Sequence, residues 1–134
     1  MNKKIILICL MILGVLNSNA QTIKVSQLKN ANWNRISPVI KNINDMVKFT
    51  STEFIMNEQF TRFDKTITQS YPYYLSETKT LTFDNAQVGK ETKGRYLVVY
   101  VEQYRQTYCF DIISVSDDTL KISYCEGETT VYKK

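Results

Sequence analysis

The sequence predicts an all-β domain, either a sandwich or a small barrel of about eight short strands. Nine tyrosines and six phenylalanines stand against only four glycines and two prolines, and aromatic residues favour strands. From Met46 onward, short runs of alternating apolar and polar residues are separated by turn residues. This alternation is typical of antiparallel sheets.

The first 20 residues differ from this domain and indicate a signal peptide. Two lysines precede an uncharged apolar run over residues 5–16, and Ser18 and Ala20 are the small residues that a signal peptidase requires. A membrane-spanning helix needs about 20 apolar residues, so the run is too short for an anchor. Cys9 lies inside the run, which argues against a lipoprotein signal. We expect cleavage between Ala20 and Gln21 and export to the periplasm or out of the cell.

The remaining chain, residues 21–134, is long enough for one domain with its own core. Without Lys3 and Lys4 the 17 basic residues become 15, against 13 acidic residues. This excess is too small and too scattered for a nucleic-acid partner.

Histidine is absent from the sequence, so the chain lacks the most frequent catalytic base and the commonest metal ligand. We therefore expect no enzyme, no metal and no cofactor. An enzyme based on carboxylates is the one catalytic class left open, and no motif supports it.

The elements are expected in the following order. Residues 21–32 show no sustained period and indicate an arm that leads into Trp33. Pro38 interrupts any regular element in the stretch up to residue 45, and residues 39–43 are compatible with one helical turn or a short strand. Pro72 cannot donate to a ladder, so its strand is expected to be an edge, a bulge or a sharply bent strand. A turn is expected at Asn57–Glu58. Strands are expected over residues 47–50, 54–56, 60–65, 66–75, 81–83, 95–102, 108–115, 120–125 and 129–132.

Residues 95–102 form the most apolar of these strands. Because it is apolar on both faces, we expect it to be covered on both sides.

The last long hairpin can be registered by matching apolar residues across it. A three-residue loop over Ser116–Asp118 places Ile112 opposite Ile122 and Cys109 opposite Cys125, whereas a two-residue turn would break this match. Directly opposed residues lie within disulfide range, and exported thiols meet an oxidising compartment. We therefore expect a Cys109–Cys125 disulfide, with two unpaired thiols as the alternative.

Several short segments resemble a known family. They are Tyr73-Tyr74-Leu75-Ser76, Phe83-Asp84, Val88-Gly89-Lys90, the run from Gly94 to Val99, and the run from Ile112 to Leu120. In these segments the chain resembles small exported lipocalin-like proteins of the Bacteroidetes type, over roughly residues 31–134. The resemblance implies an up-and-down barrel of about eight strands that begins near Trp33, in some members with a cavity for an apolar ligand. It implies no catalytic residue.

Two functions follow from this resemblance and from the composition. The first is a binding module that holds a small apolar ligand, with Tyr73, Tyr96, Tyr100 and Tyr124 as candidate lining residues, for which core packing is the alternative. The second is a filled-barrel interaction protein, namely an inhibitor, an immunity factor or an envelope accessory factor. It would act through surface loops such as the Asp84–Gly94 connection. A filled lumen would favour the second function.

Overall fold

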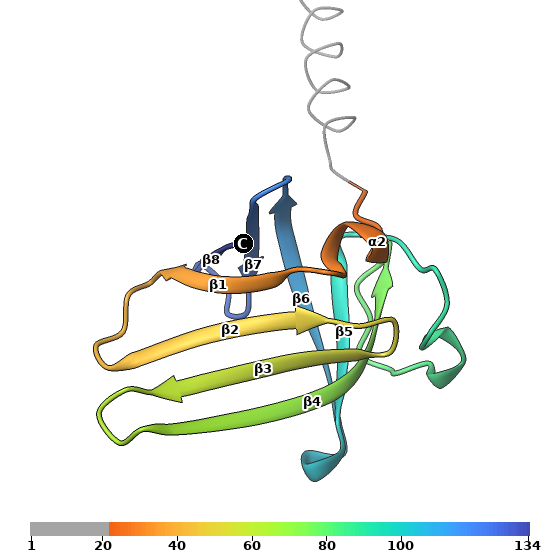
Figure 1. The fold of residues 1–134 in the computed structure, drawn as a ribbon. Coiled ribbons are helices and arrows are strands. Elements are labelled where there is room, and N and C mark those ends of the chain that lie inside the picture. Colours follow the sequence, from red (N-terminus) through yellow and green to blue (C-terminus); the bar gives the residue numbers. More distant parts are fainter. Residues whose placement is uncertain (1–21) are drawn as a thin grey trace, which may run out of the picture.

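Residues 22–134, the part described by the computed structural model, form a closed antiparallel barrel in which each strand pairs with its neighbour in sequence (Figure 1). The strands are β1 (Asn32–Ser37), β2 (Ile43–Phe49), β3 (Glu53–Phe60), β4 (Lys65–Ser76), β5 (Tyr96–Val101), β6 (Gln106–Val115), β7 (Thr119–Ser123) and β8 (Thr130–Lys133). Three single-turn helices accompany them: α2 (Val25–Leu28), η1 (Asn85–Gln87) and η2 (Glu102–Tyr104). The all-β prediction is thus confirmed, as a barrel rather than a sandwich. The expected signal peptide and the expected cleavage between Ala20 and Gln21 fall outside the described residues.

Strand β4 is sharply bent and joins two parts of the barrel. Its residues Lys65–Pro72 pair with β3, and its residues Tyr73–Ser76 pair with β5. Figure 1 shows β2, β3 and the first part of β4 running across the direction of β5 and β6. Pro72 lies where the pairing changes, so the expectation of a bent strand at this proline is confirmed.

The N-terminal segment closes one end of the barrel. Ile23, Val25 and Leu28 are buried with the barrel core. The indole Nε1–H of Trp33, which is itself fully buried in β1, donates to the Leu28 carbonyl at 3.1 Å. The N–H of Gly94, just before β5, donates to the Ile23 carbonyl at 2.8 Å. The arm that was expected before Trp33 is therefore a plug, which we define as residues 23–28.

Strand β5 is covered on both faces, as expected. Leu97 and Val99 point into the barrel core, while Val98, on the opposite face, is also fully buried. The outer cover includes Phe83, whose ring lies 5.1 Å from that of Tyr74 and 5.4 Å from that of Tyr100. The strand expected over residues 81–83 does not form, because this segment packs its aromatic ring onto the outside of the sheet instead of pairing.

The turn expected at Asn57–Glu58 is wrong, since both residues lie inside β3. They pair with Thr68 and Ile67 of β4 in a ladder of eight consecutive pairs, and the Thr68 hydroxyl donates to Asn57 Oδ1 at 2.6 Å. The chain instead reverses over residues 61–64, where Asp64 adopts a positive φ of 47°. The polar residues at 57 and 58 therefore lie within a strand of a long hairpin and not in a loop.

The β6–β7 hairpin has the expected core register but a different turn. Ser116 N–H donates to the Thr119 carbonyl at 2.8 Å, so the loop contains only Asp117 and Asp118. A register shift between Ile112 and Ser114 then restores the expected pairing of Ile112 with Ile122. Such a bulge places one extra residue on one strand. The three-residue loop is therefore wrong, and the apolar match is confirmed.

The predicted disulfide is not present, because Cys109 and Cys125 are both free. The β6–β7 ladder ends at Asp111 and Ser123. Beyond it the chain turns, with the Ser123 hydroxyl donating to the Cys125 carbonyl at 2.9 Å. Cys125 thereby leaves the strand before it can face Cys109 in a continued ladder.

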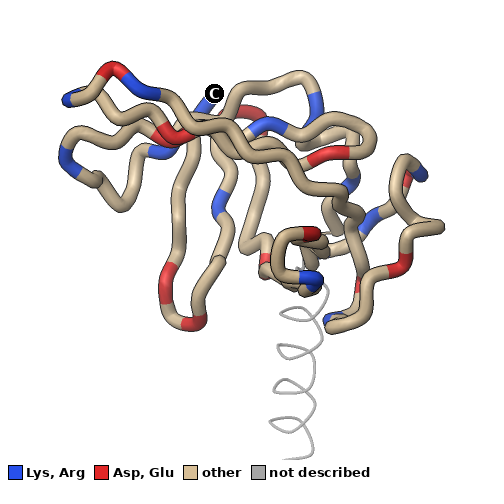
Figure 2. The backbone as a smooth tube through the Cα atoms, turned by 90° about the horizontal axis from the view of Figure 1, so that it is seen from below, with Lys and Arg blue, Asp and Glu red and all other residues tan. Residues whose placement is uncertain are grey.

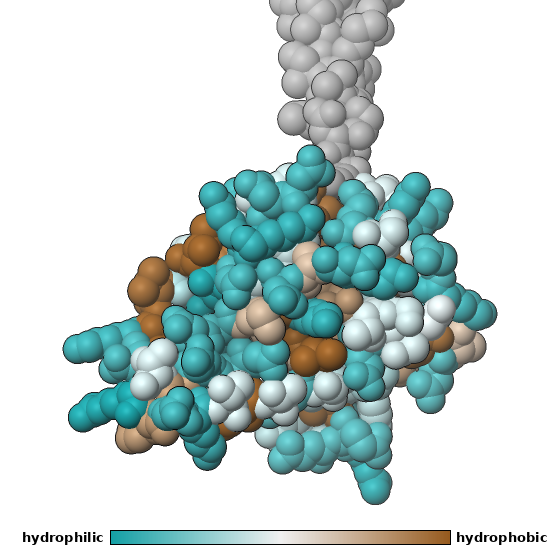
Figure 3. All heavy atoms as spheres, in the orientation of Figure 1, coloured by the Kyte–Doolittle hydropathy of each residue, from teal (hydrophilic) through white to brown (hydrophobic). Residues whose placement is uncertain are grey.

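The surface carries charges of both signs. Figure 2 shows basic and acidic positions interspersed along the backbone rather than gathered in a stripe of one sign. The face seen in Figure 3 is mostly hydrophilic, with small separate apolar groups. Exposed apolar side chains include Val39 and Phe63, in the β1–β2 and β3–β4 turns. Within residues 22–134, no helix has the length and apolar character needed to cross a bilayer.

Candidate functional site: an aromatic cavity at the open end of the barrel

A cavity of about 240 Å³ lies inside the barrel at the end away from the plug. Strand β5 starts beside the plug, because Gly94 is bonded to Ile23, and it ends at the cavity, where it contributes Val99 and Val101. Six of the nine lining side chains are aromatic. The complete lining is Phe54, Met56, Tyr71, Val99, Val101, Tyr104, Tyr108, Phe110 and Tyr124.

The aromatic rings support one another across strands. The Phe110 ring of β6 meets the Tyr124 ring edge-on, with centroids 5.0 Å apart, and stacks on Tyr108 at 6.0 Å. On the opposite wall, Phe54 of β3 is the cross-strand partner of Tyr71 in β4. Phe54 and Tyr71 are held by the pairing of β3 with β4, and Tyr108 and Phe110 by their alternate places along β6, so the sheet fixes the positions of these four rings.

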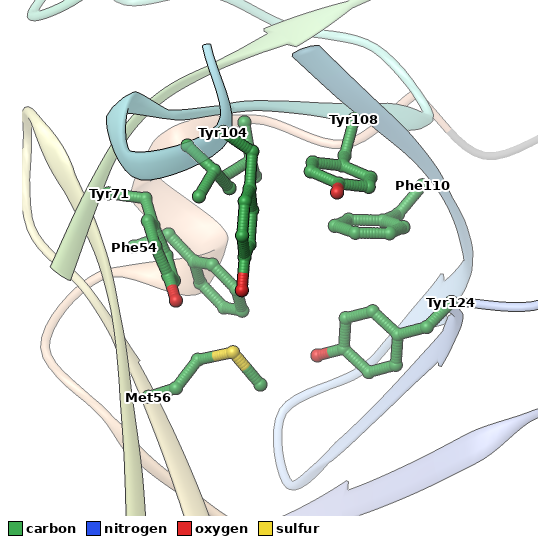
Figure 4. A pocket seen from close by; sticks show the side chains of 9 residues that line it. Phe54, Met56, Tyr71, Tyr104, Tyr108, Phe110 and Tyr124 are labelled. Carbon is green, nitrogen blue, oxygen red and sulfur yellow. The ribbon is translucent and has the colours of Figure 1, made fainter. Parts of the chain in front are cut away.

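Tyr104 stands at the mouth of the cavity. It belongs to η2, the turn between β5 and β6, and its side chain remains 64% exposed. Arg105 follows it in the left-handed conformation and reverses the chain. In Figure 4 the Tyr104 ring lies between the rings of Tyr71 and Phe54 on one side and the ring of Tyr108 on the other. In this place Tyr104 is both a wall of the cavity and part of its entrance.

Several polar atoms point into the cavity. Figure 4 shows the hydroxyls of Tyr71, Tyr104 and Tyr124 and the sulfur of Met56 directed toward its middle. Burial is the main cause that raises the pKa of Tyr71, with smaller contributions from Tyr104, Glu58 and Tyr108. Burial also raises the pKa of Tyr124 well above its usual value. These two phenols therefore stay neutral at physiological pH and can orient a ligand through hydrogen bonds.

A polar cluster lies inside the barrel beside Tyr124. The Tyr124 and Tyr132 hydroxyls are hydrogen-bonded at 2.8 Å, and burial raises the pKa of Tyr132 to about 12. Arg35, the cross-strand partner of Tyr132, forms an ion pair with Asp45. The two side chains are only 10% and 16% exposed, and Asp45 Oδ1 is buried without a hydrogen-bond partner among the described residues.

The structure places the four tyrosines expected to line a cavity in three different environments. Tyr73 is packed in the core, and Tyr124 is on the cavity wall. Tyr96 and Tyr100 lie on the outer face of β5, because they alternate with the inward Leu97 and Val99. Tyr100 contacts Phe83 there, and Tyr96 borders a hollow of about 510 Å³ that also includes both cysteines.

Sequence reasoning missed five of the six aromatic residues of the cavity, although two carried a signal. Tyr71 shares the inward face of its strand with Tyr73, two residues away, and the hairpin register that places Ile112 opposite Ile122 also places Phe110 opposite Tyr124. Tyr104 gave no signal because it belongs to a turn, where alternation does not apply.

The chemistry of the cavity is that of a binding site. Its lining offers ring faces, methyl and thioether groups, and phenol hydroxyls. Within the described part of the chain, no group of three or more His, Cys, Asp or Glu side chains is placed to hold a metal ion.

Comparison of the chain with models of protein families, with curated proteins and with solved structures finds no match. A role for the cavity therefore has to be argued from its own residues.

Proposed function

We propose that the protein is an exported binding module that holds one small apolar or aromatic molecule in the cavity at the open end of its barrel. The observation that carries this proposal is the difference between the two ends. One end is packed shut by Trp33 and the plug, while the other keeps about 240 Å³ of free space between aromatic rings. The cavity favours this function over a filled-barrel interaction protein, which needs no such space.

The volume limits the size of the ligand. A cavity of about 150 Å³ holds a benzene molecule, and drug-sized ligands occupy roughly 300–1,000 Å³. The cavity of this barrel lies between the two. It therefore suits a molecule with one ring, or a compact branched group, rather than a long acyl chain. The inward hydroxyls of Tyr71, Tyr104 and Tyr124 would orient a polar group on that molecule.

Methionine methyl groups give a direct test. In the chain after residue 20, Met46 and Met56 are the only methionines. Met56 lines the cavity, whereas Met46 borders a groove on the outer side of the sheet. With ¹³C-methyl methionine in the protein, titration with toluene or p-cresol should shift the Met56 signal until it saturates and leave the Met46 signal in place.

A variant that fills the cavity provides the control. Val101→Phe adds a ring at the cavity wall and should abolish the shift, whereas Leu81→Phe, at an exposed position, should preserve it. Absence of a saturable Met56 shift with every small probe, neutral or cationic, would overturn the proposed function. Native mass spectrometry of the protein from its own host should show a small bound molecule.

A further inference from the structure

The inward face of β3 places one carboxylate next to the cavity. Phe54 and Met56 line the cavity, and side chains in a strand alternate between faces, so Glu58 is the next inward residue. Its cross-strand partner is Asp45, which lies within the barrel and is paired with Arg35. Glu58 is half-buried, and its side chain has no ion pair or hydrogen bond within residues 22–134.

Glu58 acts electrostatically on Tyr71 of the cavity wall, and it is the charged side chain that the inward face of β3 brings near the rings. Arg35 is neutralised by Asp45, and neither lysine nor arginine lines the cavity. Lys65, on the same inward face of β4, is exposed at the far end of the hairpin and makes no ion pair with the described residues. Glu58 consequently remains beside the aromatic rings as a carboxylate without an ion pair among the described residues.

Aromatic rings that surround a small space attract cations. The face of each ring carries negative electrostatic potential, and a cation within about 6 Å of the ring centroid is stabilised, most strongly where water is excluded. Six rings surround this cavity, and Figure 4 shows them on several sides of one space.

From this combination we infer that the natural ligand is a small organic cation, an alkyl-substituted ammonium compound. Its charged group sits among the rings of Tyr71, Tyr104 and Phe110, and Glu58 supplies the opposite charge. This inference rests on the proposed function: it keeps the binding module and its cavity, and it assigns the ligand a positive charge in addition to its apolar groups.

The residues that line the cavity favour an ammonium group with alkyl substituents over a primary ammonium group. A primary ammonium group is strongly hydrated and has three donors to satisfy, but the cavity offers only phenol oxygens as acceptors, and the Tyr124 hydroxyl is already paired with Tyr132. An ammonium group that carries methyl groups loses less hydration and packs those methyl groups against the rings and Met56.

The test compares choline with 3,3-dimethylbutan-1-ol, which has nearly the same shape but carries a carbon in place of the charged nitrogen. Both are titrated while the Met56 methyl signal is observed. Choline should bind about tenfold more tightly than the neutral alcohol, because only choline gains from the ring faces and Glu58.

Two variants separate the contributions. Glu58→Gln should weaken the binding of choline severalfold and leave the binding of the alcohol unchanged. Glu53→Gln, on the same strand but facing outward and exposed, should change neither. Tyr104→Leu keeps an apolar wall but removes a ring, so it should weaken choline more than the alcohol.

The outcomes distinguish this inference from the proposed function. If the alcohol binds as tightly as choline, or if toluene shifts Met56 and choline does not, the cation inference fails and the binding module stands. If the Glu58→Gln and Glu53→Gln variants bind choline equally, the role of Glu58 is refuted. If neither the neutral probes nor choline shift the Met56 methyl signal, both proposals fail.

Discussion

Removing the Leu28 side chain tests whether the plug is part of the barrel core. Leu28 is fully buried at the end of α2, and its carbonyl receives the hydrogen bond from the Trp33 indole. Leu28→Ala leaves the backbone acceptor in place and removes only apolar side-chain atoms. The variant therefore isolates the packing between the plug and the barrel from the hydrogen bond.

The expected loss is large relative to the stability of a domain of this size. Replacing a buried leucine by alanine lowers the free energy of unfolding by roughly 2–5 kcal/mol, because the lost transfer free energy adds to the energy of the cavity left behind. For a fully buried position we expect about 3 kcal/mol, against a total free energy of unfolding of roughly 5–15 kcal/mol. With a domain of about 110 residues this should lower the melting temperature by about 10 °C.

Urea denaturation followed by tryptophan fluorescence measures this loss, because Trp33 is the only tryptophan in the chain and contacts the plug. Leu81→Ala is the matched control, since that side chain is 80% exposed, and it should cost less than about 0.5 kcal/mol. If Leu28→Ala cost no more than this control, the plug would not belong to the core. The claim that only one end of the barrel is open would then be refuted.

Three further predictions concern other parts of the barrel. Because the folded pKa of Tyr132 is about 12, against an unfolded value near 10, the stability from its neutral form is complete below pH 10 and lost between pH 10 and 12. This loss is roughly 3 kcal/mol, and Tyr132→Phe should flatten the corresponding fall in urea midpoint. Cys125 is exposed and Cys109 half-buried, so a maleimide followed by mass spectrometry should label Cys125 first, and equal rates would contradict this placement. Gly94→Ala should prevent folding or cost several kcal/mol, because φ is +145° and the added methyl would collide with the Ser76 backbone; an unchanged melting temperature would refute this.

Most of the architecture could be predicted from the sequence because strand alternation is a local signal. The all-β class, an irregularity of the strand at Pro72 and the covered strand β5 all follow from residues close together in the chain. The turn of the β6–β7 hairpin could not be predicted in the same way. A two-residue loop combined with a bulge near Ile113 gives the same apolar pairing of Ile112 with Ile122 as a three-residue loop without a bulge, so the matching criterion could not separate them.

The candidate site was harder to predict because β5 gives no indication of which face is inward. Tyr96, Val98 and Tyr100 alternate with Leu97 and Val99, and both sets are apolar. The connection between β4 and β5 covers the outer face, so this strand is buried on both sides. Alternation therefore could not show whether its tyrosines point into the lumen. Which face of β5 points inward is fixed only by its pairing with β4 and β6, and the sequence does not show that pairing.

The location of the cavity follows from a gradient of side-chain type along the inward faces of the strands. On β6, inward residues change from Val115 and Ile112 to Phe110 and Tyr108 toward the mouth. On β7 and the turn that follows it, they change from Leu120 and Ile122 to Tyr124, and on β4 from Leu75 to Tyr71.

Aliphatic side chains at the plug end have compact shapes that pack around the buried Trp33 ring and fill their part of the lumen. The rings at the mouth are rigid and are held by edge and stacking contacts with one another, so they cannot fold into the space between them as a leucine would. The same strands thus build a packed half and an open half. The rings that hold the cavity open also provide the electrostatic potential from which we infer its ligand.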